Sequence, residues 1–577
     1  MPREKKKDSS NLNSSNEGQE VNNYDIAEQF SLLAKLMDIH GENSFKSKSY
    51  SSAAFTIEKL PQQISDLPHE KIFQIKGIGE SVGKKVIEIL EHGEMDLLKE
   101  YISNTPSGVL QMMNIKGLGP KKINLLWKEM KIDTIDELQK ACEENRIADK
   151  KGFGGKTQQG ILDSIQFQQQ SAGKYLYKKV EAFAEAFTVK LKEKFPNDKF
   201  EIAGEFRRQL EIIESLEWVT TVSSEELKNY LLNDQVQLVA DRDGMLIVSA
   251  EETIFLRFNI ASEKDFYLKL FETSCTEEFL NEWKSIAKPD DHSSEEKIFS
   301  SAQFNFIPPY LRESKNILSK AREKSVDDIV QTSDIKGLIH SHSNWSDGSY
   351  TIEEMANELI KLGFEYLVIS DHSKSAGYAN GLTEQRIREQ HKYVDELNKK
   401  LAPFKIFKAI ECDILGDGAL DYENKILSTF DLVITSIHSN LDMDEEKAMM
   451  RLLGAITNPY TTILGHMTGR LLLKRKGYPV DHKTIIDACA DHHVVIEINA
   501  SPSRLDMDWR WIDYAMEKGL TLSINPDAHT IEEFYNVKYG VLVAQKGALP
   551  KNKNLSSYSL QEFEDYLQQT KKLKGIS

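Results

Sequence analysis

The residues with the clearest chemical potential lie at the ends of seven short apolar runs between Gly337 and His529. In order, these runs are GLIHSHS, YLVISDHS, IFKAIECD, LVITSIHS, TTILGHMT, VVIEINAS and LTLSINPDAH. Six of the runs end in side chains that can bind a metal ion, namely His340 and His342, His372, Glu411, His438, His466, and finally Asp527 and His529. Asp347, which follows His342 in HSHSNWSDG, can join them and brings the set to nine residues.

The repeated placement of these residues is what argues for a metal site. A single histidine near an apolar run is more often a hydrogen-bonded core or surface residue, but six of the 14 histidines of the chain fall at the same place in successive runs. Imidazole and carboxylate ligands together suit zinc, manganese or iron rather than calcium. Nine ligands exceed what one or two ions need, so the sequence predicts three clustered divalent metal ions.

The elements that must position these residues are strands of a parallel sheet. Each run has the length of a strand, and most are followed by a helical pattern of apolar residues. Strands that alternate with helices form a parallel sheet, and seven repeats predict an α/β barrel related to the eight-stranded one. In such barrels the C-terminal ends of the strands carry the chemistry, which is where the nine residues lie.

Composition indicates a cytoplasmic protein of several domains. With 577 residues the length fits three or four domains, and 40% hydrophobic residues suffice for cores. No apolar run is long enough to cross a membrane, and the polar residues 1–22 predict a disordered tail rather than a signal peptide. The four cysteines, at positions 142, 275, 412 and 489, have no paired spacing and fit a reducing compartment.

The N-terminal region contains an internal repeat. IKGIGESVGKKV (residues 75–86) recurs as IKGLGPKKI (115–123), and a weaker copy reads KKGFGGKT (150–157). Glycine pairs before a helix permit tight turns whose backbone N–H groups can hold a phosphate. The residues concerned are Gly77, Gly79, Gly117 and Gly119, followed by Lys84, Lys85, Lys121 and Lys122. Such turns also join ordinary packed helices, but two good copies with lysines favour binding to the DNA backbone without reading of sequence.

The net charge of −17 argues against indiscriminate nucleic-acid binding, because phosphate contacts need lysine and arginine. Local basic patches, and a metal cluster that would itself attract phosphate, remain compatible with this charge. DNA is therefore expected to be held at particular sites of the chain.

The motifs HSHSNWSDG, SDHS, AIECDI, SIHS, LGHMTGR and NPDAH resemble the PHP (polymerase and histidinol phosphatase) domain at the C-terminus of bacterial family X DNA polymerases. All nine ligand positions of that pattern are filled, so the resemblance implies a three-metal phosphoesterase site. It places one ion among His340, His342, Glu411 and Asp527, with Glu411 bridging to a second ion near His438. The other four candidates complete the cluster. Arg470 and Lys336 are possible phosphate contacts, with plain surface charge as the alternative.

The resemblance extends over nearly the whole chain and implies a multidomain protein. The glycine repeats are similar to helix-hairpin-helix motifs of the polymerase N-terminal and fingers regions. The expected order is a disordered tail (1–22), an α-helical helix-hairpin-helix region (23–170), an α+β polymerase palm and thumb (171–325), and the PHP domain, a distorted seven-stranded barrel (330–577). Whether Lys46 or Lys48 supports lyase chemistry cannot be read from the sequence.

The polymerase-like segment departs from the family pattern. Family X palms carry a glycine-serine turn with arginines and three aspartates that hold two magnesium ions. Here Gly204, Arg207 and Arg208 remain, but Glu205 replaces the serine. The three aspartate positions are occupied by Ser215, Glu217 and Phe255. Since magnesium requires oxygen ligands of fixed reach, we expect polymerase activity to be lost. An improvised site built on Glu214 and Glu217 is the alternative.

The sequence therefore predicts a monomeric, metal-dependent DNA phosphoesterase, a 3′-5′ exonuclease or 3′-end-processing enzyme of DNA repair. The expected cofactors are three ions of Mn²⁺ or Zn²⁺, with iron possible, and the expected partner is DNA. One alternative is a small-molecule phosphatase of the histidinol phosphatase type, which has no use for DNA-backbone clamps. A still-active family X polymerase and a non-catalytic DNA scaffold are the others, and nine intact ligands oppose the scaffold.

Overall fold

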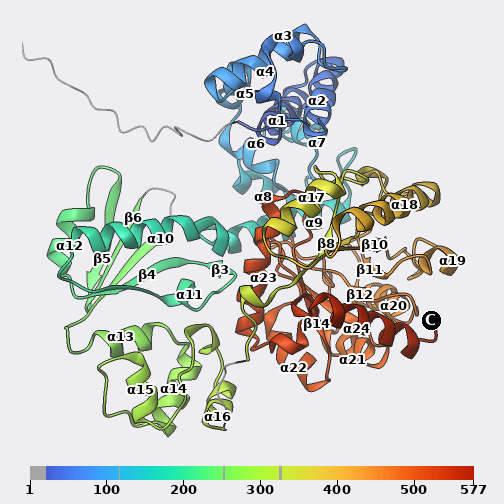
Figure 1. Cartoon of the computed structure of the whole chain (residues 1–577). Coiled ribbons are helices and arrows are strands. Elements are labelled where there is room, and N and C mark those ends of the chain that lie inside the picture. The colour runs from blue at the N-terminus through green and yellow to red at the C-terminus, as the bar shows by residue number, and fades with distance from the viewer. Residues whose placement is uncertain (1–20, 61, 116, 251–253, 324–327, 577) are drawn as a thin grey trace, which may run out of the picture. The chain divides into compact units, whose positions relative to one another are not determined.

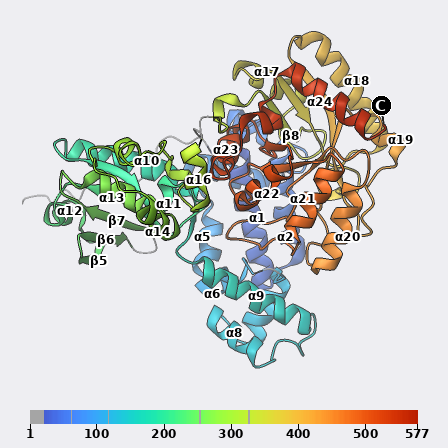
Figure 2. The same ribbon diagram turned by 90° about the horizontal axis from the view of Figure 1, so that it is seen from below.

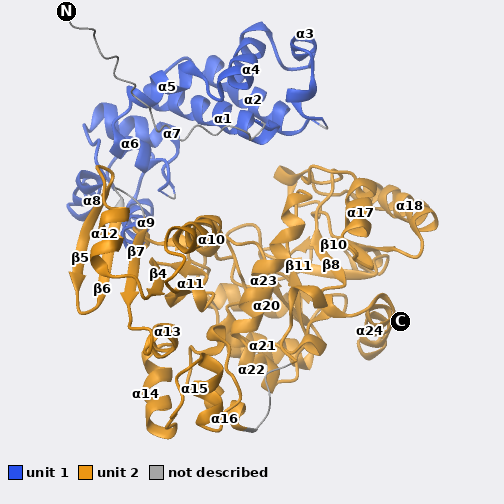
Figure 3. Cartoon of the chain, turned by 60° about the vertical axis from the view of Figure 1, so that its left-hand side comes forward, with its two compact units in different colours: residues 1–170 blue, residues 171–577 orange. Residues whose placement is uncertain are grey.

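The computed structural model describes residues 21–60, 62–115, 117–250, 254–323 and 328–576. The predicted tail lies outside these residues except for its last two positions. The chain divides into two compact units, residues 1–170 and 171–577, which Figure 3 shows in different colours. None of the described helices is long and apolar enough to cross a bilayer.

The first unit is helical throughout its described residues. Its helices are α1 (Asn23–His40), α2 (Ser44–Glu58), α3 (His69–Ile72), α4 (Glu80–His92), α5 (Asp96–Ser103), α6 (Ser107–Met112), α7 (Pro120–Asn124), α8 (Ile135–Glu143) and α9 (Gly155–Ser171). Helix α1 begins with a capping box between Asn22 and Asp25 and ends at Gly41, whose φ of 82° is left-handed. Its apolar face, including Phe30 and Leu33, belongs to one buried core that extends to Ile165 in α9.

The second unit begins with a mixed sheet. Its elements are β1 (Tyr175–Leu176), α10 (Tyr177–Lys194), β2 (Phe200–Ala203), α11 (Gly204–Arg207), β3 (Ile212–Ile213), β4 (Ser215–Thr220), α12 (Ser224–Leu231), β5 (Val236–Arg242), β6 (Met245–Ala250) and β7 (Phe255–Ile260). Five strands form a sheet in the order β2-β4-β7-β6-β5, in which only β4 and β7 are parallel to each other. Four helices follow, α13 (Phe266–Thr273), α14 (Glu277–Ile286), α15 (Glu295–Ser301) and α16 (Asn316–Glu323), and they enclose an aromatic core of their own.

The last region is a nearly closed barrel of seven parallel strands, as predicted. The strands are β8 (Gly337–Ser341), β9 (Tyr366–Ile369), β10 (Lys405–Asp413), β11 (Leu432–Ser436), β12 (Ile463–Leu464), β13 (Val495–Asn499) and β14 (Leu522–Asn525), and they neighbour one another in chain order. The first and last strands meet just beyond β14, where the N–H of His342 donates to the carbonyl of Ala528 at 2.8 Å.

Helices cover the outside of this barrel, as Figure 2 shows. They are α17 (Ile352–Lys361), α18 (Glu384–Leu401), α19 (Asn424–Leu427), α20 (Glu445–Ile456), α21 (His482–Asp491), α22 (Ile512–Glu517), α23 (Val537–Lys546) and α24 (Leu560–Leu573). Almost every strand residue is buried, which is why the strands read as continuous apolar runs in the sequence. The core between strands and helices is the largest in the chain.

Candidate metal centre

The barrel brings all nine predicted ligands to the C-terminal ends of its strands. His340 and His342 lie at the end of β8, Glu411 near the end of β10, and the others in the loops that follow β8, β9, β11, β12 and β14. His340 and Asp527 have φ angles of 63° and 53°, in the left-handed region that only glycine adopts freely. Strained backbone at non-glycine residues is typical of functional sites, where the surrounding structure holds a side chain in place.

Glu411 lies at the centre of the cluster. Its carboxylate is fully buried and lies within 3.6 Å of a ring nitrogen of each of five histidines. These are His340, His342, His372, His438 and His466. The carboxylate and these five imidazoles together form a buried set of potential metal ligands.

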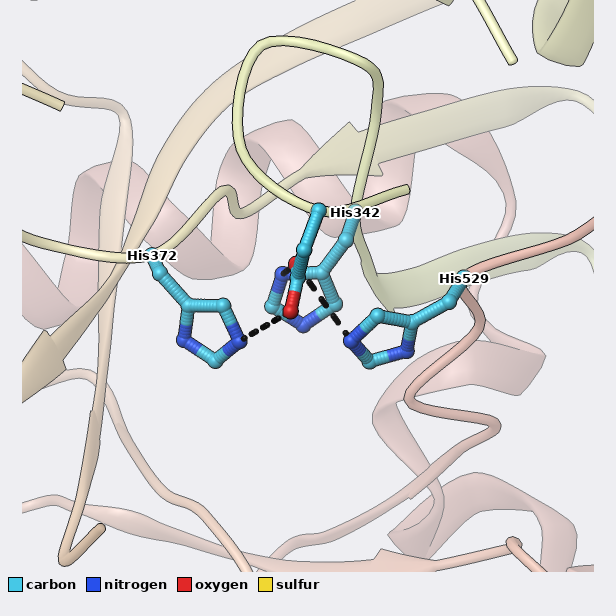
Figure 4. Close-up of side chains that lie close together, drawn as sticks. His342, His372 and His529 are labelled. Carbon is cyan, nitrogen blue, oxygen red and sulfur yellow. Dashed lines mark ion pairs between the residues drawn. The ribbon is translucent and has the colours of Figure 1, made fainter. Parts of the chain in front are cut away.

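The side chains form three groups that can each hold an ion. One comprises His342, Asp347, His372 and His529, the second His340, His342 and Asp527, and the third His372, Glu411 and His438. Figure 4 shows His342, His372 and His529 converging, and Asp347 lies 3.9, 3.6 and 3.5 Å from their ring nitrogens. His466 is outside these groups but lies 3.0 Å from Glu411.

The ligand atoms of the cluster are arranged for binding metal ions rather than for hydrogen bonding to one another. Among the described residues, buried atoms of the cluster have no hydrogen-bond partner: Nε2 of His340, both ring nitrogens of His342, Nδ1 of His372, Nδ1 of His466 and Oε2 of Glu411. Orphaned polar atoms are rare in protein interiors because each costs about 1–3 kcal/mol. Ligation by cations would satisfy them.

A second layer of residues holds the ligands in orientation. Nδ1 of His340 lies 2.6 Å from Glu497, and Nδ1 of His438 lies 2.8 Å from Asp413. Asn499 donates to Asp527 at 3.1 Å. The sequence reasoning did not identify these three residues, although a glutamate inside the apolar run VVIEINAS was an available signal, because a buried carboxylate needs partners.

The pKa values of neighbouring groups in the cluster are shifted in opposite directions. Burial lowers the pKa of His340, but Glu497, Asp527 and Glu411 outweigh it and raise the pKa well above the usual range. Burial and the neighbouring His529 and His372 instead lower the pKa of His342 to about 3. Burial raises the pKa of Glu411, but the surrounding histidines lower it well below its usual range. Perturbations of this size in one buried cluster mark a functional site.

One arginine faces the cluster, and it is not one of the two predicted cations. Nε of Arg504, in the loop after β13, lies 3.6 Å from Asp527. Arg470 instead bonds Asp508 at 2.7 Å and the backbone carbonyls of Arg504 and Leu505, so it supports the loop that carries Arg504. Lys336 precedes β8 and lies at the opposite, N-terminal end of the strands, which places it away from the centre.

Both glycine pairs lie directly before a helix, and the two members of each pair differ in backbone conformation. Gly77 and Gly117 have φ of 95° and 87°, whereas Gly79 and Gly119 have ordinary φ angles and serve as the N-caps of α4 and α7. All four glycines are exposed, as are Lys84 and Lys121, while Lys85 and Lys122 are half-buried. Lys84 pairs with Glu80 and Lys122 donates to the carbonyl of Gly117.

The residues at the three positions where family X polymerases are expected to carry aspartates contact each other or other protein groups. Ser215 pairs with Phe255 across β4 and β7, and its hydroxyl donates to Glu217 at 3.3 Å. Arg257 lies 3.7 Å from Glu217. All three groups of potential metal ligands found among the described residues lie in the barrel, and none involves this sheet.

The glutamate and arginines of the neighbouring turn are also engaged. Glu205 accepts the backbone N–H of Glu214 at 2.7 Å. Arg207 forms a two-pronged ion pair with Glu295, and Arg208 bonds Glu313 at 2.9 Å. The positive charge that a triphosphate would need is therefore neutralised within the protein.

Comparisons with known proteins agree with this architecture. The PHP domain family matches residues 339–501, a helix-hairpin-helix domain family matches residues 21–95, and a SAM-like helix-hairpin-helix tandem matches residues 109–166. The tandem includes the weak third glycine repeat. Asp527 and His529 lie beyond the matched PHP segment, and the fold brings them to it.

Individual relatives cover the chain to different extents. The chain is 31% identical over 574 residues to "DNA polymerase/3'-5' exonuclease PolX" of Bacillus subtilis, covering 94% of this chain and 99% of that protein. It is 26% identical over 251 residues to "Probable phosphatase TTE1963" of Caldanaerobacter subterraneus, covering 41% and 92%. A third relative, "Probable phosphatase YcdX" of Escherichia coli, is 24% identical over 28% of this chain and 63% of its own length.

Proposed function

Because this chain belongs to the bacterial family X DNA polymerases with a C-terminal PHP domain, we propose that it hydrolyses DNA phosphoesters as a 3′-5′ exonuclease or 3′-end-processing enzyme of DNA repair. The observation that carries the proposal is the convergence of nine potential ligands, with the buried Glu411 at their centre, in a chain that also contains helix-hairpin-helix turns.

We propose that the centre binds three divalent ions, Mn²⁺ or Zn²⁺ and alternatively iron. The group of His342, Asp347, His372 and His529 shares His342 with the second group and His372 with the third. Ions held by the three groups would therefore lie next to one another. Divalent ions in such a cluster neutralise charge on a phosphate ester and lower the pKa of water. Imidazole and carboxylate donors suit these metals.

The side chains around the cluster define how a DNA end would be held. Arg504 is placed to contact a phosphate oxygen, because its guanidinium has five N–H donors and only Asp527 lies near its Nε among the described residues. The loop with Arg504 is fixed by Arg470, so the cation is oriented before substrate arrives. Gly77, Gly79, Gly117, Gly119 and the lysines that follow them would hold the backbone elsewhere on the strand.

The second candidate is a phosphatase for small phosphomonoesters, which the probable phosphatases among the relatives favour. It would use the same cluster, and the two functions differ in substrate rather than in chemistry. The helix-hairpin-helix regions, which match over residues 21–95 and 109–166, support DNA over a metabolite.

We further propose that the polymerase-like segment no longer transfers nucleotides. The support is the replacement of its three carboxylate positions by Ser215, Glu217 and Phe255, and the pairing of Arg207 and Arg208 with Glu295 and Glu313. Two magnesium ions require several carboxylate groups, and Glu217 is the one that remains at the three positions.

We also propose the domain bounds, the location and the oligomeric state of the protein. We divide the chain into a tail (1–22), a DNA-binding region (23–170), a degenerate palm and thumb (171–325) and the PHP domain (330–577). We propose that the protein is a monomer and that it works in the cytoplasm, and the four buried free cysteines support a reducing compartment.

The decisive experiment compares the protein with Asp527→Asn. Both proteins are incubated with Mn²⁺ and DNA carrying labelled 3′-hydroxyl or 3′-phosphate ends, and separately with a small phosphomonoester. An amide is a weak, uncharged ligand, so the variant should lose bound metal and most activity on DNA. Undiminished digestion with unchanged metal content would show that the site lies elsewhere, and activity on the monoester alone would select the phosphatase.

A further inference from the structure

The polymerase-like segment contacts the barrel through one helix in particular. Helix α23 follows β14 and is held at both of its ends by residues from 171–325. At its start, Glu181 of α10 accepts bonds from Lys538 at 2.5 Å and from Tyr539 at 2.8 Å. At its end, Lys546 donates to the backbone carbonyl of Arg208 at 2.8 Å and to Glu313 at 2.9 Å. Figure 1 shows α10 extending toward α23.

The two contacts are shielded from water to different degrees. Glu181 is 8% exposed and Lys546 is 4% exposed, whereas the side chain of Lys538 is 46% exposed. An ion pair is held more firmly when its charges are withdrawn from water, because removing one partner then leaves a buried charge unpaired. This applies fully to Lys546 and in part to Glu181, whose carboxylate is buried although its partner Lys538 is not.

Helix α23 in turn is packed tightly against the strand that leads to the metal centre. A Cβ added at Gly540 would lie 2.6 Å from Ile524 of β14 and 2.6 Å from Ala500, so the helix cannot move toward the strand without collision. Two residues beyond β14 the chain reaches Asp527, and then His529.

The short segment between β14 and α23 is tied to both the metal centre and α10. The 3-10 helix Glu532–Asn536 carries Glu533, which accepts the backbone N–H of His529 at 2.7 Å. The same helix ends in Asn536, whose side chain accepts a bond from Lys178 of α10 at 3.1 Å. The segment that carries two potential ligands is thus fixed at one end by the barrel and at the other by the polymerase-like segment.

We propose that residues 171–325 act as a positioning element of the metal centre, holding α23 at both ends and thereby fixing the segment that presents Asp527 and His529. The proposal rests on the proposed function only in treating these two residues as metal ligands. It gives the polymerase-like segment a role that needs no nucleotide transfer, since it acts through contacts such as the bond from Lys546 to the backbone carbonyl of Arg208.

The test uses the full-length protein and Glu181→Gln, which keeps the shape of the side chain and removes its charge. The matched control is Asp513→Asn, which breaks the Lys320–Asp513 pair between the same two regions at 2.6 Å, but at an exposed place on α22 that bonds neither α23 nor the segment after β14. Mn²⁺ affinity is measured by electron paramagnetic resonance, and hydrogen exchange of residues 526–536 is measured in the metal-free protein. Turnover of a small phosphomonoester gives kcat and KM separately.

We expect Glu181→Gln to weaken Mn²⁺ binding by about tenfold, the lower end of the range seen when groups supporting metal ligands are removed. Exchange of residues 526–536 should accelerate, and kcat should fall with KM little changed, while Asp513→Asn matches the parent. The charge reversal Glu181→Lys should weaken binding further, and adding Lys538→Glu should restore part of it.

Unchanged Mn²⁺ affinity and unchanged hydrogen exchange in both Glu181 variants would overturn the proposal. The contacts would then only stabilise the packing of the two regions against each other. A different result is expected if the metal centre is held as proposed but the proposed DNA-cleaving function is wrong. In that case the parent protein binds Mn²⁺ and responds to Glu181→Gln but does not cut DNA.

Discussion

The carboxylate of Glu497 lies 2.6 Å from Nδ1 of His340, so it favours a proton on Nδ1 and leaves Nε2 facing the metal centre. Nε2 lies 3.3 Å from Glu411 and 3.4 Å from Asp527. Glu497 also accepts bonds from the side chains of Asn499 and Asn525, both at 2.8 Å. A histidine oriented in this way is a better metal ligand because its tautomer and ring angle are set in advance.

This relationship predicts the effect of Glu497→Gln. The amide cannot accept from all the donors that surround the carboxylate, so His340 should lose its orientation, and metal affinity should fall about 10–100-fold. Titration of the metal-free protein with Mn²⁺ measures the loss. Glu562→Gln, a surface change at the start of α24, is the control and should bind as the parent does. Equal affinity in both variants would mean that His340 is not a ligand.

Metal binding should release protons. Burial lowers the pKa of His438, but Glu411 and Asp413 outweigh it and raise the pKa to about 10 in the metal-free protein. Burial is likewise outweighed at His529, where Asp347 and Asp527 raise the pKa to about 9. Both rings therefore carry a second proton at pH 7, which a metal must displace.

The sign of the pH effect follows from these raised values. Below pH 9 the free protein binds more protons than the metal complex, so apparent affinity should rise with pH, about tenfold per unit for each proton released. Calorimetric titrations with Mn²⁺ at pH 7 in buffers of different ionisation enthalpy count the protons. A heat of binding that does not depend on the buffer would contradict the prediction.

The glycine turns make a prediction that concerns DNA alone. Gly117→Ala forces a side chain into a left-handed conformation that costs roughly 1–2 kcal/mol, and should distort the turn that presents N–H groups to phosphate. Affinity for DNA should fall about tenfold, equally for different sequences, because backbone contacts do not read bases. Fluorescence anisotropy with duplexes of unrelated sequence measures it.

The control for this change is Gly93→Ala. Gly93 has a φ of 79° and open space around it, as Gly117 does, but it is the C-cap of α4 and does not belong to either glycine-lysine repeat. It should share the local strain and keep DNA affinity. Neither substitution should alter hydrolysis of a small phosphomonoester. If both weaken DNA binding equally, the effect is one of stability and the turn has no special role.

The features that could be predicted from the sequence are those set by the position of a residue along a single strand or turn. The barrel order and the placement of His372 or His466 follow from strand-length runs, since the ends of parallel strands meet at one edge. The helix-hairpin-helix family could likewise be predicted from Gly77 and Gly117, because a left-handed turn demands glycine.

Contacts between distant segments could not be predicted. Glu497 lies 157 residues from His340, and Glu313 lies 233 residues from Lys546. Neither pairing has a periodic or local signature, because it depends on how the sheet closes and how regions dock. Arg504 was overlooked in favour of Arg470 for the same reason: which arginine faces the centre depends on the path of one loop.

The last prediction is that the protein does not extend a primer. Of the three positions Ser215, Glu217 and Phe255, only Glu217 offers a carboxylate to a nucleotide triphosphate and its metal ions, and this carboxylate already has Arg257 at 3.7 Å. Arg208, whose counterpart in family X enzymes is expected to hold the triphosphate, is only 13% exposed and paired with Glu313. Without two magnesium ions the incoming charge stays unneutralised, and removing electrostatic stabilisation at one position typically costs about 3–4 kcal/mol of barrier.

The assay uses the Asp527→Asn protein, so that any product survives exonuclease digestion, with Mg²⁺ or Mn²⁺ and all four deoxynucleotides. No extension above background is expected. Restoring aspartates at positions 215, 217 and 255 should not revive it, because Arg207 and Arg208 stay locked in their ion pairs. Extension that appears in this protein and disappears on Glu217→Gln would show that Glu217 still supports a working metal site, and the segment would then have to be regarded as a polymerase.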